Sequence, residues 1–470
     1  MHTSDLRGSS IQNLCMNDCR LGNPDKLTCK LGSLTFGKNM IRIDIRNVRD
    51  ELTDLHTCLA NTSFERLEGL GLGHHLNSVH CPPFDKFNIF ISKLKNLRIL
   101  DCYNLDYVND ETVKKIAENL ENLEYLGLRC CRRVYGTSLD VLLKRCTHLR
   151  SLILSSTSVD NNSLIFIDWA STQIEELDLS CCEKLTDAAL ISMLPALKNL
   201  EYLCLNFCGK GRVFSRDLVE NCSRTGFLRK LKLLSLLLTN DLTFKGFEKL
   251  CTPIDGINRF ENLTELSLRC CRLINTNDFT RTILTTLPNL KVFEIGDLFH
   301  QSEPFGGELH HFDGDLSYIP LQMNSPNILQ VELYPLENLD DMSRIDRLRK
   351  NGLVSFIYNL SAVNQKLEML GVYNRYYSLT PYDNNYTLQN ERSENGAAFR
   401  SISHLMRKCR NLRALQLPNL DETLKRVVTV AIKIHKETIR SDFVLSLNND
   451  NVVKLSNPRR SLDFEIKKQF

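Results

Sequence analysis

The 470-residue chain is almost balanced in charge, with 59 lysines and arginines against 56 aspartates and glutamates and a net charge of +3. This balance does not favour binding to nucleic acid or to an anionic membrane, so a protein is the expected partner. No apolar run approaches the roughly 18 residues that a membrane-spanning helix needs, and the amino-terminal MHTSDLRGSS has no apolar signal core. Eighteen cysteines without a secretion signal indicate a reducing compartment, which predicts a cytoplasmic or nuclear protein.

One nine-residue phrase recurs between residues 97 and 208. Its five copies begin at Leu97, Leu123, Leu149, Ile174 and Leu200 and read LRILDCYNL, LEYLGLRCC, LRSLILSST, IEELDLSCC and LEYLCLNFC. The steps between them are 26, 26, 25 and 26 residues. A period in the twenties with an L-x-x-L-x-L core is typical of a leucine-rich repeat solenoid. Because each repeat contacts only its neighbours, we expect one elongated domain.

The phrase can be followed outward over residues 1–420, which predicts about 14 repeats, most regular over 97–225. Upstream copies begin at Ile11, Leu31 and Leu67, with a short strand-like IRIDI at Ile41; downstream copies begin at Leu231, Leu263, Leu290, Ile328, Leu367 and Leu412. Longer steps in the second half predict insertions at 296–327 and 374–396. The second is expected to be a flexible loop, and the alternative is a specificity element that folds over one end of the concave wall. Residues 421–470, with a helical TLKRVVTVAIKIHKETI and a strand-like DFVLSL, are expected to form a C-terminal cap and tail.

Each copy changes its hydrophobic period after the phrase. Within the phrase, leucines at the first, fourth and sixth places must point inward, and the third, fifth and seventh side chains then point outward. Farther on, Leu139, Leu142, Leu143 and Cys146 recur at i, i+3, i+4 and i+7, as helical positions do. The pattern therefore predicts an α/β horseshoe with a concave parallel β-sheet and convex helices.

The cysteines follow the same register. Five of them, Cys19, Cys131, Cys182, Cys208 and Cys271, take the ninth place of a phrase, where the chain leaves the strand. The sequence contains no C-x-x-C pair that could chelate a metal or exchange disulfides. We interpret these thiols as small core residues packed in a ladder of turns.

Two of the repeats resemble those of a known protein family. The unit from Ile174, IEELDLSCCEKLTDAAL, and the unit from Leu123, which ends in KRCTHL, resemble the cysteine-containing repeats of the F-box/leucine-rich-repeat family. The resemblance implies that the repeats capture a protein substrate on their concave face. It also implies a separate F-box that docks a Skp-type adaptor and a cullin. The function that it implies is substrate recognition by an SCF (cullin-RING) ubiquitin ligase, in ubiquitin-dependent protein degradation.

The F-box of that family resembles a helical segment that opens with Leu-Pro and an acidic residue and ends near a tryptophan. Here Leu-Pro occurs only at Leu194, Leu287 and Leu417, and the single tryptophan, Trp169, falls in a repeat. Two expectations follow: either an F-box precedes this chain, or the chain is a scaffold or inhibitor that binds a partner through its concave face without a ligase.

Side chains that point outward from the strands are the candidates for partner binding. Tyrosine, phenylalanine and arginine are enriched in protein interfaces because each combines a large contact area with a polar end. The alternative is that such tyrosines only stabilise the sheet by cross-strand packing. The predicted partner-binding residues are Tyr103, Tyr125, Arg129, Asp178, Tyr202, Asn206, Phe207, Glu265, Arg269, Glu294, Tyr334 and Tyr373.

Three glycines, Gly69, Gly71 and Gly73, also occupy successive outward positions. They would leave bare backbone that a partner's main chain could approach. Weak packing of an early, irregular repeat is the other interpretation.

We expect no enzyme, metal or cofactor. No local catalytic motif such as G-x-S-x-G or H-E-x-x-H is present, and the histidine clusters within 74–81 and 300–311 lack zinc or calcium spacing. A GTPase-activating role, with Arg129 or Arg269 as the inserted arginine, is the third hypothesis and has the least support.

Overall fold

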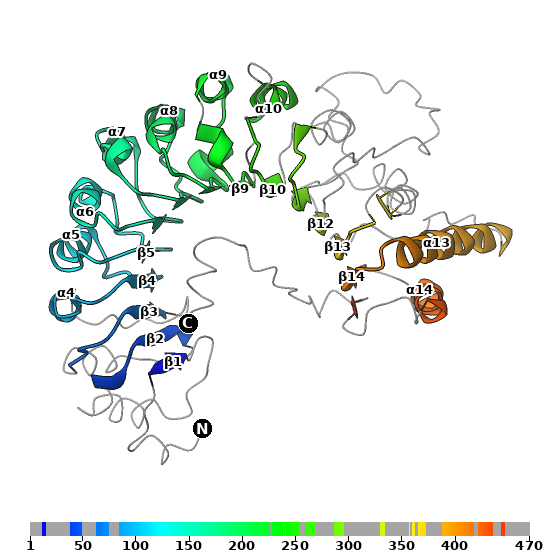
Figure 1. Ribbon diagram of the computed structural model, residues 1–470, viewed down its shortest axis with the longest axis horizontal. Coiled ribbons are helices and arrows are strands. Elements are labelled where there is room, and N and C mark those ends of the chain that lie inside the picture. Colours follow the sequence, from blue (N-terminus) through cyan, green and yellow to red (C-terminus); the bar gives the residue numbers. More distant parts are fainter. Residues whose placement is uncertain are drawn as a thin grey trace, which may run out of the picture. The chain divides into compact units, whose positions relative to one another are not determined.

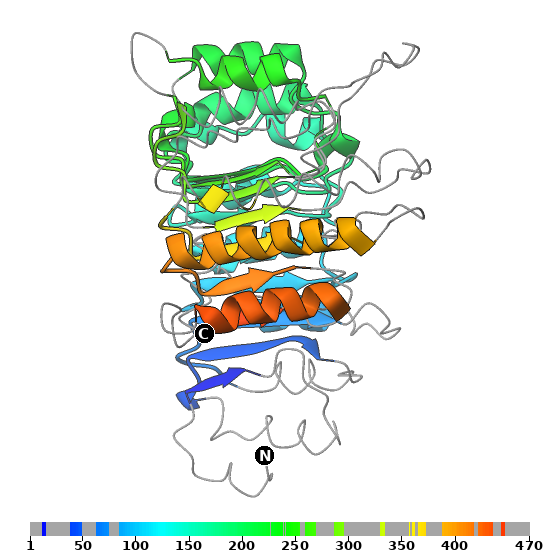
Figure 2. The same ribbon diagram turned by 90° about the vertical axis from the view of Figure 1, so that its right-hand side faces the viewer.

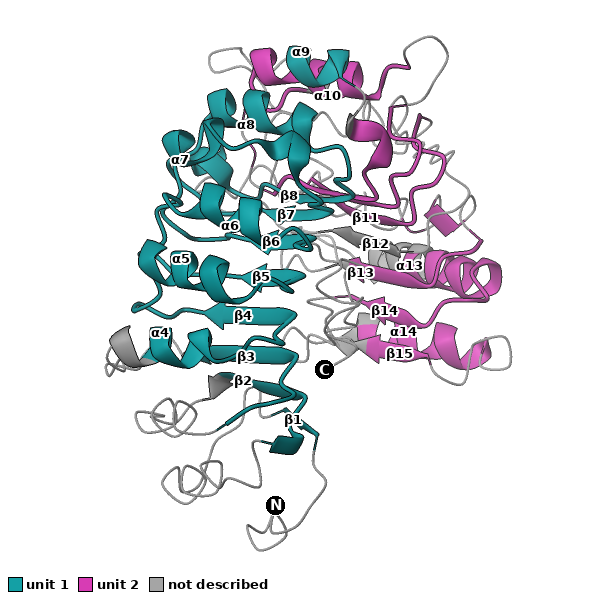
Figure 3. Cartoon of the chain, turned by 60° about the vertical axis from the view of Figure 1, so that its left-hand side comes forward, with its two compact units in different colours: residues 1–213, 220–227, 458–470 teal, residues 214–219, 228–457 magenta. Residues whose placement is uncertain are grey.

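The computed structural model describes residues 12–15, 38–48, 63–74, 84–225, 227–237, 239, 241–253, 259–268, 286–295, 330–333, 357, 360–361, 365–372, 388–417, 422–435 and 443–446. These residues fall into two compact units (Figure 3). Unit 1 contains the described residues up to Val213 and those in 220–227, and unit 2 contains 214–219 and those from Leu228 onward. None of the described helices is long and apolar enough to cross a bilayer.

The strands of unit 1 pair in chain order, each parallel to the next. They line the concave side of the unit (Figure 1). The described strands are β1 (Asn13–Cys15), β2 (Arg42–Val48), β3 (Gly69–His74), β4 (Ile99–Tyr103), β5 (Tyr125–Gly127), β6 (Ser151–Ile153), β7 (Glu176–Asp178) and β8 (Tyr202–Cys204).

Helices cover the convex side of the same unit (Figure 1). They are α4 (Phe84–Ser92), α5 (Asp110–Asn119), α6 (Leu139–Arg145), α7 (Asn161–Ile165) and α8 (Asp187–Met193). The next helix, α9 (Arg216–Arg224), has residues in both units. Short 3-10 turns η2 (Trp169–Ser171), η3 (Leu194–Ala196), η4 (Cys208–Gly211) and η5 (Phe227–Lys230) complete the connections. A parallel ladder with a helix after each strand from β3 to β8 is the architecture of a leucine-rich repeat solenoid, and it confirms the predicted fold.

The phrase explains why each strand lies where it does. Its inward leucines, such as Leu126, Leu152 and Leu177, are completely buried, and burying such a side chain contributes roughly 1.5–3 kcal/mol. The helical residues Leu139 and Leu142 are buried as well, which confirms the predicted change of period. Local capping sets where these helices begin: Asn109 and Asp160 each form a capping box at the start of α5 and α7.

The eighth place of the phrase has a left-handed backbone in five successive repeats. The residues are Asn104, Cys130, Ser156, Cys181 and Phe207, with φ between 52° and 60°. In the first four, the N–H donates to a carbonyl of the next repeat, for example Cys181 N to Asn206 O at 2.7 Å. The left-handed residue therefore turns the chain out of the strand and links neighbouring repeats.

The ninth-place side chains form the ladder of turns that the sequence predicts. The Cys182 thiol lies 3.1 Å from the Leu154 carbonyl of the preceding repeat, and the hydroxyl of Thr157, at the equivalent place, donates to the same carbonyl at 2.7 Å. Cys131 and Cys208 are likewise buried, with their sulfur atoms near preceding-repeat carbonyls. Cys19 and Cys271 lie outside the described residues.

The upstream repeats differ from the sequence prediction. β1 pairs directly with β2, so the strand next to β1 comes from MIRIDIRNV at Met40 and not from the phrase at Leu31, which lies outside the described residues. Met40, Ile43 and Ile45 take the three inward places and are buried. The L-x-x-L-x-L pattern did not identify the copy at Met40, because methionine and isoleucine replace all three of its leucines.

Unit 2 continues the architecture with its own parallel strands. They are β9 (Leu233–Ser235), β10 (Glu265–Leu268), β11 (Val292–Ile295), β12 (Gln330–Leu333), β13 (Met369–Val372), β14 (Ala414–Gln416) and β15 (Val444–Ser446). The helices are α10 (Phe244–Cys251), α13 (Leu388–Lys408) and α14 (Glu422–Ile434), and α13 and α14 lie side by side (Figure 2).

Helix α14 and strand β15 lie where the cap was predicted. The second insertion differs from the predicted loop where the structure describes it, because α13 begins at Leu388 and includes residues 388–396; residues 374–387 lie outside the described residues. The polar glutamate, asparagine and serine residues in this segment gave no helical pattern of apolar residues. The buried apolar residues of α13, Ala398, Ile402 and Leu405, come after it in the sequence. The first insertion, 296–327, lies outside the described residues.

The neighbouring cysteines 181 and 182 should differ sharply in reactivity. Burial raises the pKa of the Cys182 thiol to about 12, whereas Cys181 is exposed. At pH 8 only about one Cys182 thiol in ten thousand would be ionised, so a thiol-specific alkylating reagent should modify Cys181 first. Tandem mass spectrometry of the folded protein measures this order, with urea-unfolded protein as the control. Equal labelling of the two cysteines in the folded state would contradict the buried turn ladder.

Candidate protein-binding face

Three rows of outward side chains run across the concave face of unit 1, at the third, fifth and seventh places of successive phrases. The strand register aligns the third- and fifth-place rows, and it pairs Gly73 with Tyr103 in the seventh-place row. The third-place row is Arg42, Gly69, Ile99, Tyr125, Ser151, Glu176 and Tyr202; the fifth-place row is Asp44, Gly71, Asp101, Gly127, Ile153, Asp178 and Cys204; the seventh-place row is Arg46, Gly73, Tyr103, Arg129, Ser155, Ser180 and Asn206.

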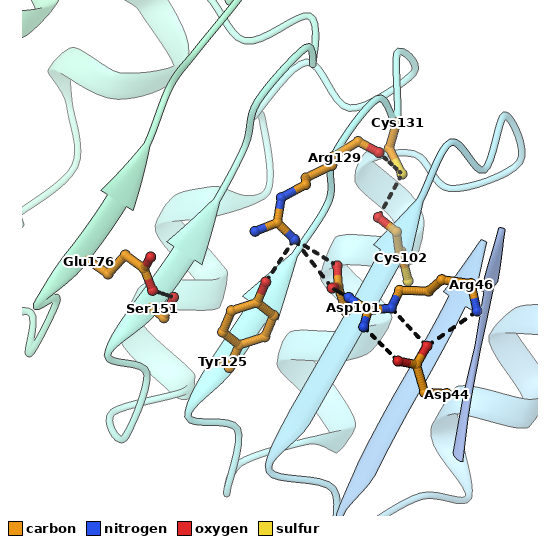
Figure 4. Close-up of polar contacts among 9 residues, drawn as sticks. All are labelled: Asp44, Arg46, Asp101, Cys102, Tyr125, Arg129, Cys131, Ser151 and Glu176. Atoms are coloured by element: carbon orange, nitrogen blue, oxygen red, sulfur yellow. Dashed lines mark hydrogen bonds and ion pairs between the residues drawn. The ribbon is translucent and has the colours of Figure 1, made fainter. Parts of the chain in front are cut away.

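An ion-paired group, here called the Asp–Arg cluster, joins three of these strands: Asp44, Arg46, Asp101, Arg129 and Tyr125 (Figure 4). The Arg46 guanidinium donates to both Asp44 carboxylate oxygens, at 2.8 and 2.6 Å, and its Nη1 donates to Asp101. Arg129 Nη1 approaches the two Asp101 oxygens at 3.3 and 3.2 Å and donates to Tyr125 Oη at 2.9 Å. Asp101 therefore lies between two arginines.

Two glycines make room for this cluster. A Cβ on Gly71 would come within 2.8 Å of Asp44 Oδ1 and 3.2 Å of Arg46 Nε, and one on Gly127 within 2.3 Å of Asp101 Oδ1. The fifth-place row thus alternates acid, glycine, acid, glycine from Asp44 to Gly127. The backbone that the sequence suggested was bare at Gly71 is covered by the chain's own arginine, which corrects that prediction.

The cluster contains two carboxylates and two guanidinium groups, so its formal charges cancel. Its four charged side chains are 3–20% exposed. Burial by itself would lower the pKa of Arg46, but the hydrogen bond to Asp44 and the charges of Asp101 and Asp44 outweigh it and raise that pKa. The arginine therefore stays protonated, and the cluster is a fixed element of the face.

Tyr125 corrects the sequence interpretation of a tyrosine stripe. It lies on the outward row as predicted, but it is 1% exposed. Its ring packs in a buried cluster with Ile99 and Ile153 from the two neighbouring strands, while its hydroxyl accepts from Arg129. Tyr125 therefore fits the alternative interpretation, in which a strand tyrosine stabilises the sheet by packing against neighbouring strands.

The other predicted residues are distributed over both units. Tyr103, Tyr202, Asn206 and Phe207 are half-buried on unit 1, as is Asp178, whose carboxylate accepts from Ser180 N at 2.9 Å. Glu265 and Glu294 are half-buried on β10 and β11 of unit 2. Arg269, Tyr334 and Tyr373 lie outside the described residues.

The position of Arg129 does not suit the inserted arginine of a GTPase-activating protein. Such an arginine must reach into a partner's site, whereas Arg129 is held by Asp101 and Tyr125. Within the described part of the chain, no group of three or more His, Cys, Asp or Glu residues is placed to hold a metal ion. The two histidine clusters lie outside it, apart from the backbone of His74.

Three members of the cluster were missed by sequence reasoning: Asp44, Arg46 and Asp101. Asp44 and Arg46 belong to the copy at Met40, whose register was not recognised. Asp101 stands at an outward place of a recognised copy. The signal that could have found all three is opposite charge at nearby outward places, two repeats apart.

No protein-family model matches the chain. Among curated proteins it is similar to the BTB/POZ domain-containing protein FBL11 of Arabidopsis thaliana, at 24% identity over 109 residues, which cover 20% of this chain and 12% of that protein. Among solved structures it is similar to a chain of the Rad7 and Elc1 complex in yeast, with a TM-score of 0.49, 16% identity and coverage of 72% and 82% of the two chains. A leucine-rich repeat protein of Leptospira interrogans matches at a TM-score of 0.39 and 14% identity, covering 95% of this chain and 98% of that one.

Removing the charge of Asp101 should destabilise unit 1. Asp101→Asn leaves two buried guanidinium groups facing each other with one acid fewer, which should cost about 3 kcal/mol. Glu124→Gln is the matched control, because the Glu124–Arg98 pair is exposed and worth at most about 1 kcal/mol. Urea unfolding followed by circular dichroism compares them. Similar losses for both variants would show that the cluster is not a buried network.

Proposed function

We propose that the concave face of unit 1 binds a protein partner, as the binding surface of a repeat scaffold. The observation that carries this proposal is the half-burial of Tyr103 at the end of β4, of Tyr202 on β8 and of Asn206 just after β8, all at outward places of the same sheet. Tyrosine offers a large contact area with a polar tip at a low entropic cost.

The Asp–Arg cluster supports the same proposal. It holds Arg129 and Asp101 in place across β2, β4 and β5 before any partner arrives. Side chains locked by hydrogen bonds lose little conformational freedom on binding, so a partner would meet a preorganised surface.

A more specific role is substrate recognition for an SCF (cullin-RING) ubiquitin ligase. It is supported by the resemblance of the units at Leu123 and Ile174 to F-box/leucine-rich-repeat proteins. The short similarity to FBL11 is compatible with it. In this role the concave face would bind the protein to be degraded, and an F-box preceding this chain would recruit a Skp-type adaptor and a cullin. The alternative is an F-box-less scaffold or inhibitor that uses the same face.

A double substitution tests the concave face. Tyr202→Ala with Asn206→Ala removes two half-buried side chains from β8 and the residues after it, and should reduce partner recovery by more than tenfold. Tyr125 is left unchanged, because its loss would disturb packing. Affinity purification with quantitative mass spectrometry identifies the partners of the wild type. Phe166→Ala, a change on a convex residue that is 83% exposed, is the control. Equal partner recovery from the double variant would refute the concave-face proposal.

A second measurement separates the ligase from the scaffold. Purification of the protein as encoded by its complete gene should recover a Skp-type adaptor and a cullin, and inhibition of cullin activation should raise the abundance of its concave-face partners. Recovery of those partners with neither adaptor nor cullin, and with unchanged abundance, would favour the scaffold.

A further inference from the structure

One edge of unit 1, where the strands end, displays a group of cations here called the cationic edge: Arg132 and Arg133 after β5, Lys184 after β7, and Lys210 and Arg212 after β8. All five side chains belong to exposed residues. Tyr135, which is 51% exposed, lies among them with the Lys184 ammonium 5.5 Å from its ring centroid.

Hydrogen bonds between repeats hold these loops side by side. Ser158 N donates to Val134 O at 2.9 Å, and Ser158 Oγ donates to Arg132 O at 2.6 Å. A parallel bridge joins Asp160 to Lys184, and Gly209 N donates to Cys182 O at 3.0 Å. With about 4.8 Å between strands, the edge from β5 to β8 is about 15 Å long. An extended peptide of four or five residues has that length.

At the opposite edge of unit 1, where the strands begin, the arginines form ion pairs with glutamates. There Arg98 lies 3.8 Å from Glu68 and 2.7 Å from Glu124, and Arg150 lies 3.5 Å from Glu175. These cations are paired within the protein.

At the cationic edge, Lys210 pairs with Glu183 at 3.6 Å, whereas Arg132, Arg133 and Arg212 form no ion pair with any residue that the structure describes. The nearby acids Asp110 and Asp160 are hydrogen-bonded to backbone amides, those of Gly136 and Ser163 among them.

Lys210 has a left-handed backbone conformation, which is unfavourable for a lysine. Its φ is 58°, between Gly209 at 56° and Gly211 at 76°. A glycine adopts this left-handed conformation without the steric cost that a lysine incurs. The side chain is 65% exposed and makes only a surface ion pair, so stability does not account for a lysine at this place.

We propose that the cationic edge binds an acidic, extended segment of a protein partner. The proposal rests on the proposed protein-binding function and specifies the chemistry of a partner segment beyond the concave rows. Free guanidinium groups match carboxylates in geometry and charge. A single-stranded nucleic acid is the less favoured ligand, because it would need several aromatic side chains for stacking, and the Lys184 ammonium already lies over the Tyr135 ring.

Fluorescence anisotropy with a labelled oligoglutamate peptide tests the edge on the full chain. We expect binding that weakens steeply with salt. Arg132→Glu with Arg133→Glu and Arg212→Glu should reduce affinity at least roughly tenfold, because attraction becomes repulsion. The control reverses Lys114, Arg145 and Lys198, three exposed cations elsewhere on unit 1; it changes the net charge equally and should have little effect. Equal loss in both triple variants, no binding, or tighter binding of a single-stranded oligonucleotide of equal charge would overturn the proposal.

Lys210→Gly provides a variant whose effect cannot come from misfolding. We expect its Tm to be unchanged or higher and its oligoglutamate affinity to fall a few-fold; unchanged affinity would remove Lys210 from the site. The Tyr202→Ala, Asn206→Ala variant should still bind oligoglutamate. Its loss of the natural partner tests the concave face separately, so failure of one proposal can be told from failure of the other.

Discussion

No repeat of this protein can bury its own leucines; each does so only when another repeat stacks against it. The parallel ladder provides that stacking, and the bonds that lead out of each strand reinforce it. Four successive eighth-place residues, beginning with Asn104, donate to the following repeat through a left-handed backbone. The ninth-place thiols Cys131 and Cys182 add contacts to the preceding repeat. This nearest-neighbour dependence holds every outward side chain in a fixed row.

The rows have different physical characters. The Asp–Arg cluster occupies the concave rows near β2 to β5, where glycines at the fifth place admit side chains from the strands on either side. Burying four charges is expensive unless each is paired, and Asp101 pairs with both arginines. Tyr103, Tyr202 and Asn206 in the same rows are half-buried and uncharged. An ion-paired patch and an uncharged polar patch therefore share one face.

The two edges of unit 1 also contrast. At the edge where strands begin, alternating glutamates and arginines neutralise each other, which keeps that edge from attracting charged partners. At the other edge, arginines that form no ion pair with any described residue lie near a lysine whose backbone conformation suits glycine. In the proposed function, a partner bound to the concave face of unit 1 would extend its acidic segment over the edge where the strands end, because the other edge is neutralised by its own ion pairs.

The sequence by itself determined the repeat, the parallel strands, the helices after them and the buried ladder of turns, because each depends on residue type at a fixed place in a short phrase. It also identified Tyr125 and Arg129 as outward residues. Only the tertiary structure decided what they do, since Tyr125 is buried by Ile99 and Ile153 and Arg129 is bound to an acid one repeat away. Arg46 reaches Asp101 across a glycine, over 55 positions of sequence. Side-chain contacts between repeats depend on strand register and on the space that a missing Cβ leaves, and neither is encoded in the phrase that specifies the scaffold.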